Sequence, residues 1–201
     1  MPRTKEKFEA MRETTRQKIE AAALSLFARN GLSVKVGEIA GTAGVSQGLL
    51  YSHYQSKDAL IVELIRQATE ISGRSIMEIA GNGGTAAEKI KSITEMMCGM
   101  FNNTSPIGID YFMFMVQVGL NGFWLPELPR TAQKYPHPVE SLARVIVQGQ
   151  TEKSVAPGNQ FGMSVVYWAA IQGLCCYAVT GAAVSLEPKI LNRILLREEY
   201  L

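Results

Sequence analysis

The residues with the clearest chemical potential lie in one short segment, between positions 36 and 57. Small and apolar side chains recur there at helical spacing, and Gly44 stands where the chain must turn. Glycine permits the positive φ of a sharp turn, and Ser46 is a good cap for a helix that follows. The pattern therefore predicts two short helices joined by a tight turn, at roughly 36–43 and 46–53.

The two predicted helices pack through one face and leave one face of the second helix open. Ile39 and Ala40 form the inner face of the first helix, and Leu50 packs back onto them. The outward positions of the second helix are Gln47, Gly48, Leu49, Tyr51, Ser52 and His53. This is a helix-turn-helix arrangement, whose second helix fits a DNA major groove. Any helical hairpin can show the same spacing, so spacing alone leaves DNA binding open.

The whole run resembles the N-terminal domain of the tetracycline-repressor (TetR) family of bacterial transcriptional regulators. The resemblance covers residues 16–62 and rests on Ala23, Phe27, Gly31, Ile39-Ala40, Ala43 to Ser46, Gly48, Leu50-Tyr51, His53-Tyr54 and Ser56 to Leu60. It implies DNA contacts by Lys35, Ser46, Gln47, Gly48, Leu49, Tyr51, His53 and Lys57. Gln47, Gly48 and Leu49 would lie near base edges. Tyr51, His53 and Lys57 would contact phosphates, and Tyr54 would lie either along the DNA backbone or in the core.

One departure from the family pattern precedes the first helix of the pair. Val34-Lys35-Val36 stands where family members usually carry Ser or Thr, so we expect no side-chain cap and a charged contact from Lys35 instead. Residues 1–57 hold nine Lys and Arg against five Asp and Glu, whereas residues 58–201 hold eleven against thirteen. A basic N-terminal quarter suggests a polyanion contact. Two interpretations, a mobile basic arm and an ordinary solvated N-terminus, fit Arg3, Lys5, Lys7 and Arg12.

Beyond this segment, apolar residues recur at helical spacing almost throughout the 201-residue chain. A long helix is predicted from Ser56-Lys57 to the glycines near residue 81, and at roughly 36 Å it can join two parts of a molecule. Later helices are expected at roughly 138–149, 160–181 and 186–199. The predicted fold class is all-α, with about nine helices. Residues 1–56 would form a three-helix DNA-binding domain, and residues 57–201 a larger helical domain for effector binding and dimerisation.

The stretch from Phe161 to Leu186 carries no charged residue and formally satisfies the length test for a membrane span. It lacks flanking cationic clusters, and small residues line one helix face: Ala169, Gly173, Cys176 and Thr180. The family resemblance implies a homodimer through the last two helices. The apolar face of the last helix would carry Ile190, Leu191, Ile194 and Leu195. We therefore expect a homodimer and no membrane contact.

The helices of the middle region are rich in methionine and aromatic residues, which adapt their shape or offer flat apolar walls. The resemblance implies an inducer pocket in this region. Composition and helix phase suggest a lining of Met97, Phe101, Met113, Phe114, Trp124, Tyr167 and Gln172. Because polar side chains are few among them, we expect a small apolar or aromatic effector.

Other classes of function find little support in the residues. There is no Ser–His–acid set, no phosphate-binding loop and no carboxylate pair in an apolar setting, so we expect neither enzymatic activity nor a cofactor. Two His and three Cys offer no metal site, and adjacent Cys175 and Cys176 are expected to be buried structural thiols. Cysteine usage and the lack of a signal peptide suggest a cytoplasmic protein. The family resemblance implies a bacterial protein that associates with the nucleoid when bound to DNA.

The leading hypothesis is a homodimeric, ligand-responsive transcriptional repressor. Its dimer would bind a near-palindromic operator on double-stranded DNA, and a small apolar effector would release it. The alternative is a DNA-binding regulator that a protein partner controls, with no small-molecule effector.

Overall fold

The computed structural model describes residues 2–102, 107–121, 137–180 and 186–201. These ranges contain nine α-helices and a 3-10 helix, Glu198–Tyr200, and none of their residues belongs to a β-strand. The α-helices are α1 Pro2–Asn30, α2 Val36–Ala43, α3 Gln47–His53, α4 Lys57–Gly81, α5 Ala86–Asn102, α6 Ile107–Asn121, α8 Pro138–Thr151, α9 Gln160–Val179 and α10 Pro188–Asn192. The all-α prediction is confirmed, and the bounds of α2, α3 and α4 agree closely with the predicted ranges.

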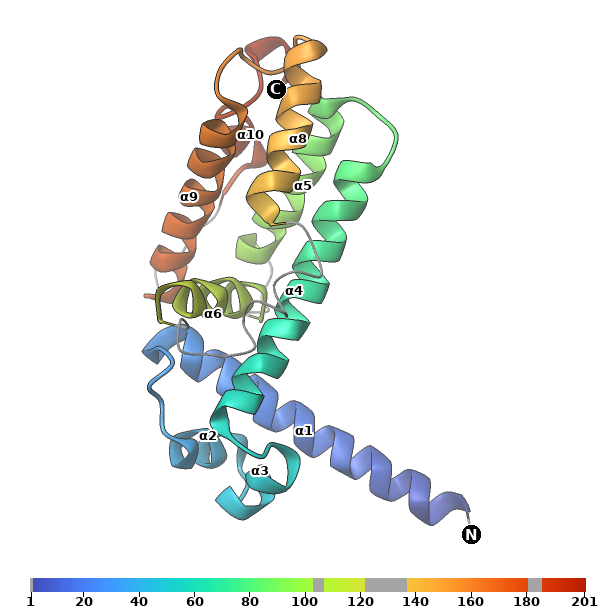
Figure 1. The fold of residues 1–201 in the computed structure, drawn as a ribbon, viewed down its shortest axis with the longest axis vertical. Helices are drawn as coiled ribbons and strands as arrows, with labels where there is room; N and C mark the ends of the chain where they lie inside the picture. Colours follow the sequence, from blue (N-terminus) through green and yellow to red (C-terminus); the bar gives the residue numbers. More distant parts are fainter. Residues whose placement is uncertain (1, 103–106, 122–136, 181–185) are drawn as a thin grey trace.

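The helices form two groups that α4 connects (Figure 1). α2 and α3 lie at one end of the molecule, beside α1, whereas α5, α8, α9 and α10 lie together toward the other end. α4 runs from the first group into the second, and α6 lies across α1 between them. The N-terminal half of α4 is anchored by four fully buried side chains, Leu60, Ile61, Leu64 and Ile65. A displacement of α4 would therefore reach both groups.

Apolar and polar pairs hold α6 against α1. Phe114 of α6 stacks on Phe27 of α1, with ring centroids 6.0 Å apart, and both side chains are fully buried. Asp110, in the first turn of α6, accepts a hydrogen bond from the Ser25 hydroxyl and faces the charge of Arg29. Burial raises the pKa of Asp110 above its ordinary value, and these two α1 residues oppose the shift. The carboxylate is therefore held in place by α1.

α6 also bonds to α4. The hydroxyl of Tyr111, the residue after Asp110, donates to the side-chain oxygen of Gln67 on α4 at 2.9 Å. Because α6 contacts α1 on one side and α4 on another, it connects the helix that lies beside α2 and α3 with the helix that leads away from them.

The C-terminal segment differs from the single helix predicted over residues 186–199. α10 is one short helix, after which the chain turns and Leu196 forms an isolated antiparallel bridge with Val155. The buried side chains of this segment include Leu191, Leu195 and Leu196, whereas Ile190 is 56% exposed. The predicted apolar face of Ile190, Leu191, Ile194 and Leu195 was wrong for the exposed Ile190, because the chain turns after α10 and does not continue as one helix.

α9 presents an uncharged face to the outside of the chain. Its stretch Gln160–Ala178 is long and apolar enough to cross a membrane by length and composition alone, and only 28% of it is buried within the chain. The exposed side chains include Phe161, Val165, Val166, Ala169, Gly173, Cys176 and Tyr177. Cys175 is buried, which raises the pKa of its thiol to about 12. The expectation that both adjacent thiols are buried was wrong for Cys176.

The stacked pair between α6 and α1 leads to a stability prediction. We expect Phe114→Ala to lower the free energy of unfolding by about 3–5 kcal/mol, because it removes a fully buried ring and leaves a cavity against Phe27. The control is Leu120→Ala, which truncates a 69% exposed side chain of the same helix and should change stability by less than about 0.5 kcal/mol. Urea denaturation followed by circular dichroism measures both. Similar losses in the two variants would contradict the assigned packing.

Candidate nucleic-acid interface

The turn between α2 and α3 is built as the residue types require. Gly44 ends α2 at φ +68°, in the left-handed region that glycine adopts without strain. Ser46 then caps α3, since its side-chain oxygen accepts a hydrogen bond from the Leu49 amide at 3.1 Å. Gln47 opens the helix with its amide nitrogen over Gly37, where an added Cβ would lie only 3.0 Å away. The glycine on α2 therefore leaves room for the Gln47 side chain.

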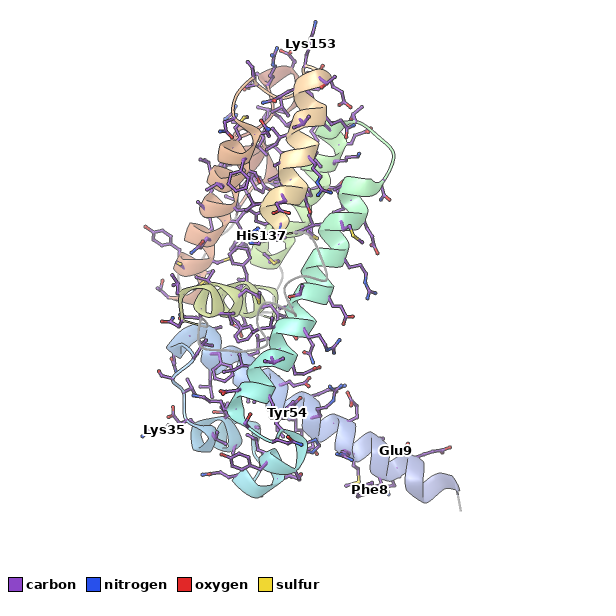
Figure 2. The ribbon with its side chains drawn as sticks, in the orientation of Figure 1. Phe8, Glu9, Lys35, Tyr54, His137 and Lys153 are labelled. Atoms are coloured by element: carbon purple, nitrogen blue, oxygen red, sulfur yellow. The ribbon has the colours of Figure 1, made fainter. Side chains whose placement is uncertain are left out.

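The start of α2 lacks a side-chain cap, as predicted. Lys35 occupies the capping position and its side chain makes no capping hydrogen bond. The Glu38 carboxylate reaches back instead and accepts from the Lys35 backbone amide at 3.4 Å. The Lys35 side chain is exposed at the outer edge of the α2–α3 group (Figure 2).

α3 is anchored on one face and open on the other. Leu50 is fully buried in one core with Ile39 and Ala40 of α2. Leu49 and Tyr51 point outward, 41% and 49% exposed. Of the other positions predicted to contact DNA, Ser46, Gln47 and Gly48 are exposed, whereas His53 and Lys57 are half-buried. The structure thus brings these residues together on and beside one short helix.

A buried network secures the end of α3. The hydroxyl of Tyr54, the residue that follows α3, donates to the carboxylate of Glu20 on α1. The guanidinium of Arg16 lies 3.1 Å from the same carboxylate and 3.6 Å from that of Glu63 on α4. Burial raises the pKa of Tyr54, and the hydrogen bond to Glu20 raises it further. Figure 2 places Tyr54 beside α1 at the start of α4, so the network joins all three helices.

Lys57 has an intramolecular role that the sequence pattern did not reveal. Its ammonium donates to the backbone carbonyls of Leu32 at 2.9 Å and Val34 at 3.3 Å. These bonds tie the loop after α1 to the start of α4, whose first turn Ser56 caps through the Ala59 amide. A lysine ammonium has three donors, so one remains for a phosphate. That contact stays a prediction.

The N-terminal segment continues α1 as helix from Pro2. Of the two interpretations left open for this segment, a separate mobile arm fits less well, since the segment projects from the body as part of one rod (Figure 2). Phe8 and Met11 on it are 68% and 62% exposed.

Four of the residues predicted to line a pocket belong to one hydrophobic core, and a fifth, Phe101, packs against it. Met97 and Met113 are buried and Phe101 is half-buried, whereas Phe114 packs into the α1 interface. Tyr167 is fully buried, but Gln172 is exposed on the outer face of α9. Trp124 lies outside the described residues.

The sequence interpretation missed Trp168 as a candidate pocket residue. It is 8% exposed, and its ring meets that of Tyr167 edge-on at 5.6 Å. Its indole N–H has no hydrogen-bond partner among the described residues. The signal available in the sequence was its place directly after Tyr167, which was already a predicted lining residue.

Comparison with known proteins agrees with this geometry. Residues 19–64 match the family described as bacterial regulatory proteins, tetR family. A segment of 78 residues is 33% identical to the HTH-type transcriptional regulator BetI of Brucella anthropi, and it spans 39% of this chain and 40% of that relative.

Two solved structures share the fold over most of their length. The MbdR regulator from Azoarcus sp. CIB has a TM-score of 0.75 at 21% identity, with 91% of this chain and 97% of that chain covered. A transcriptional regulator from Saccharomonospora viridis in complex with choline has a TM-score of 0.66 at 18% identity, with 91% and 98% covered. The helical body beyond residue 64 is thus also similar to that of regulators.

The Tyr54 network leads to a second stability prediction. We expect Tyr54→Phe to lower the free energy of unfolding by about 1–3 kcal/mol, because the buried Glu20 carboxylate loses a donor. Tyr51→Phe is the matched control, since it removes a hydroxyl from an exposed ring of α3 and should cost less than about 0.5 kcal/mol. Urea denaturation of both variants measures the difference. An equal effect would show that the Tyr54 hydroxyl contributes nothing to holding α3.

Proposed function

Because the chain belongs to the tetR family of bacterial regulatory proteins, we propose that it is a homodimeric repressor and that a small effector lowers its affinity for its operator. One observation carries the proposal: α3 leaves Leu49 and Tyr51 exposed while Leu50 anchors it. A helix held rigidly by one face can enter a major groove with the other. No catalytic step belongs to this function, and the protein works in the bacterial cytoplasm, on the nucleoid when bound to DNA.

The proposed DNA contacts divide into base readout and phosphate contacts. Gln47 can pair with adenine through its amide, and Leu49 can touch a thymine methyl group. Tyr51, His53 and Lys57 contact the backbone and set the orientation of α3, with Lys35 and Ser46 at its edges. Residues 1–56 form the DNA-binding domain and residues 57–201 the effector-binding and dimerisation domain.

The uncharged outer face of α9 supports a homodimer. Phe161, Val165 and Val166 are 55%, 43% and 59% exposed there, and small residues continue along the face. On α8, which packs beside α9, Val147 is also 46% exposed. A second copy can cover this surface symmetrically and place two α3 helices on half-sites about 34 Å apart. The interface is thus assigned to α8 and α9, because the long terminal helix of the sequence prediction does not form.

The contacts of α6 support release by an effector. A small molecule bound between α9 and the helices α5, α6 and α8 can move α6 or α4. α4 carries Glu63 of the network that holds α3, and α6 packs against α1 and α4. The choline complex of the Saccharomonospora viridis regulator supports a small-molecule effector for this fold. The effector shifts the population toward dimers whose α3 spacing does not match the operator.

The DNA-binding proposal is tested with a duplex from upstream of the coding region and random competitor DNA. We expect tight, salt-sensitive binding by the wild-type protein and an affinity about ten-fold lower for Tyr51→Ala, which removes a proposed phosphate contact. Tyr200→Ala, at the other end of the chain, is the control and should bind as the wild type does. Equal affinity of Tyr51→Ala and wild type for the duplex would contradict the proposed orientation of α3. If the wild-type protein bound the duplex no more tightly than competitor DNA, the proposal that this duplex contains the operator would be contradicted.

The dimer is tested by a charge placed on the α9 face. We expect Ala169→Glu to yield monomers in sedimentation velocity and to lose operator affinity, because two carboxylates would be buried without partners. Ser92→Glu adds the same charge to an exposed position of α5 and should leave the dimer intact. A monomeric wild-type protein, or a dimeric Ala169→Glu variant, would contradict the assigned interface.

A further inference from the structure

The indole N–H of Trp168 is a buried hydrogen-bond donor without an acceptor among the described residues. The side chain is 8% exposed. Buried donors in native proteins are nearly always satisfied, because an unmade bond costs the desolvation of the donor. A partner that supplies an acceptor would remove this cost.

The described groups nearest Trp168 are polar and uncharged, and they can orient a ligand. Tyr167 meets the indole edge-on, and its hydroxyl lies 2.9 Å from that of Thr94 on α5. Burial raises the pKa of Tyr167 to about 12 and also raises the pKa of the nearby Cys98 thiol. The Tyr167–Thr94 pair uses one of its two hydroxyl hydrogens internally and keeps the other available. This cluster therefore offers neutral donors at neutral pH.

The position of Trp168 places its ring inside the helical body. One turn before it, the Ser164 hydroxyl donates to the Val139 carbonyl of α8 at 2.8 Å. Tyr167 turns toward α5 through its bond to Thr94. The buried face of α9 at this level therefore lies against α8 on one side and α5 on the other, in the part of the chain that the proposed function assigns to the effector.

Charged ligands find no counter-ion here. Among the described residues, the buried charged side chains are Glu20 and Asp110, and both are engaged by residues of α1. Within the part of the chain that the structure describes, a cation would therefore lack a buried carboxylate beside Trp168, and an anion would lack a buried Lys or Arg. A pure hydrocarbon would leave the indole N–H unpaired.

We propose that Trp168 donates a hydrogen bond from its indole N–H to a neutral effector that carries an acceptor oxygen on an otherwise apolar body, such as a ketone, an ester or a lactone. This inference rests on the proposed function and names the chemical class of its effector. Affinity comes from the apolar body, and selection comes from the single oxygen that pairs with the indole.

The test uses three kinds of probe on the full-length protein. A series of γ-alkyl-γ-lactones of increasing chain length supplies the acceptor, alkylcyclopentanes of the same ring size and alkyl chain lack it, and choline represents a cation. Binding is measured by isothermal titration, and operator release by the duplex assay. We expect the lactones of matching length to bind and the alkylcyclopentanes to bind about ten-fold more weakly.

The variant that isolates the donor is Trp168→Phe, which keeps an aromatic ring and removes the N–H. We expect it to bind the lactones about ten-fold more weakly than the wild type does. Its affinities for lactone and hydrocarbon should then differ by about two-fold or less. Tyr200→Phe, which removes a hydroxyl from the C-terminal 3-10 helix, should bind as the wild type does. Thermal unfolding and operator binding show whether Trp168→Phe is folded.

A measurement without a core substitution gives a second readout. The chain has two tryptophans, so the wild-type protein shows two indole N–H signals in a nitrogen-15 spectrum, and Trp124→Phe identifies the signal of Trp168. We expect the Trp168 proton signal to move downfield when the lactone binds and to stay in place with the alkylcyclopentane.

Three results would overturn the inference: equal lactone binding by wild type and a folded Trp168→Phe variant, an unmoved Trp168 signal in the lactone complex, or no lactone binding at millimolar concentration, whether or not choline binds. In each case, tight wild-type binding to the operator would leave the DNA-binding function standing, whereas loss of operator binding would contradict that function separately.

Discussion

The position of α3 depends on a buried carboxylate that cannot remain unpaired. Glu20 is only 8% exposed, and a charge removed from water must find donors nearby. Its donors are Tyr54 at the end of α3 and Arg16 on α1, and Arg16 also faces Glu63 on α4. A helix of seven residues has little stability of its own. The recognition helix therefore takes its orientation from a charge on α1 and from its link to α4.

The same logic extends away from the DNA-binding end. α6 bonds to α4 through Tyr111 and Gln67, and it packs on α1 through Phe114 and Asp110. These contacts are close-packed or hydrogen-bonded, so a small shift of α6 cannot be absorbed without changing α1 or α4. A ligand near Tyr167 and Trp168 need not touch α3 to affect it. α9 packs on α6, and α6 packs on α1 and α4, the two helices that share the Glu20 network.

The parts of the structure set by local chemistry could be predicted from the sequence. Gly44 and Ser46 determine their turn through their own backbone and side-chain preferences, and the α2, α3 and α4 bounds follow. Contacts between distant segments could not be predicted this way. Lys57 bonds to the carbonyls of Leu32 and Val34. Phe114, which composition had suggested as pocket lining, stacks on Phe27. The end of α10 also depends on a distant partner, because Leu196 pairs with Val155.

The uncharged stretch of α9 shows why hydropathy alone cannot choose between a lipid and a protein partner. One side of the helix is already used, since Tyr167, Ile171 and Cys175 are fully buried against its neighbours. To span a bilayer, α9 would have to leave that core and expose the Tyr167 and Thr94 hydroxyls, whose hydrogen bond joins it to α5. Its other side carries Gln172, an amide that is costly in hydrocarbon but easily paired at a subunit interface. A helix with one face in its own core and an apolar, small-residue face outward therefore fits a second copy of the chain better than a membrane.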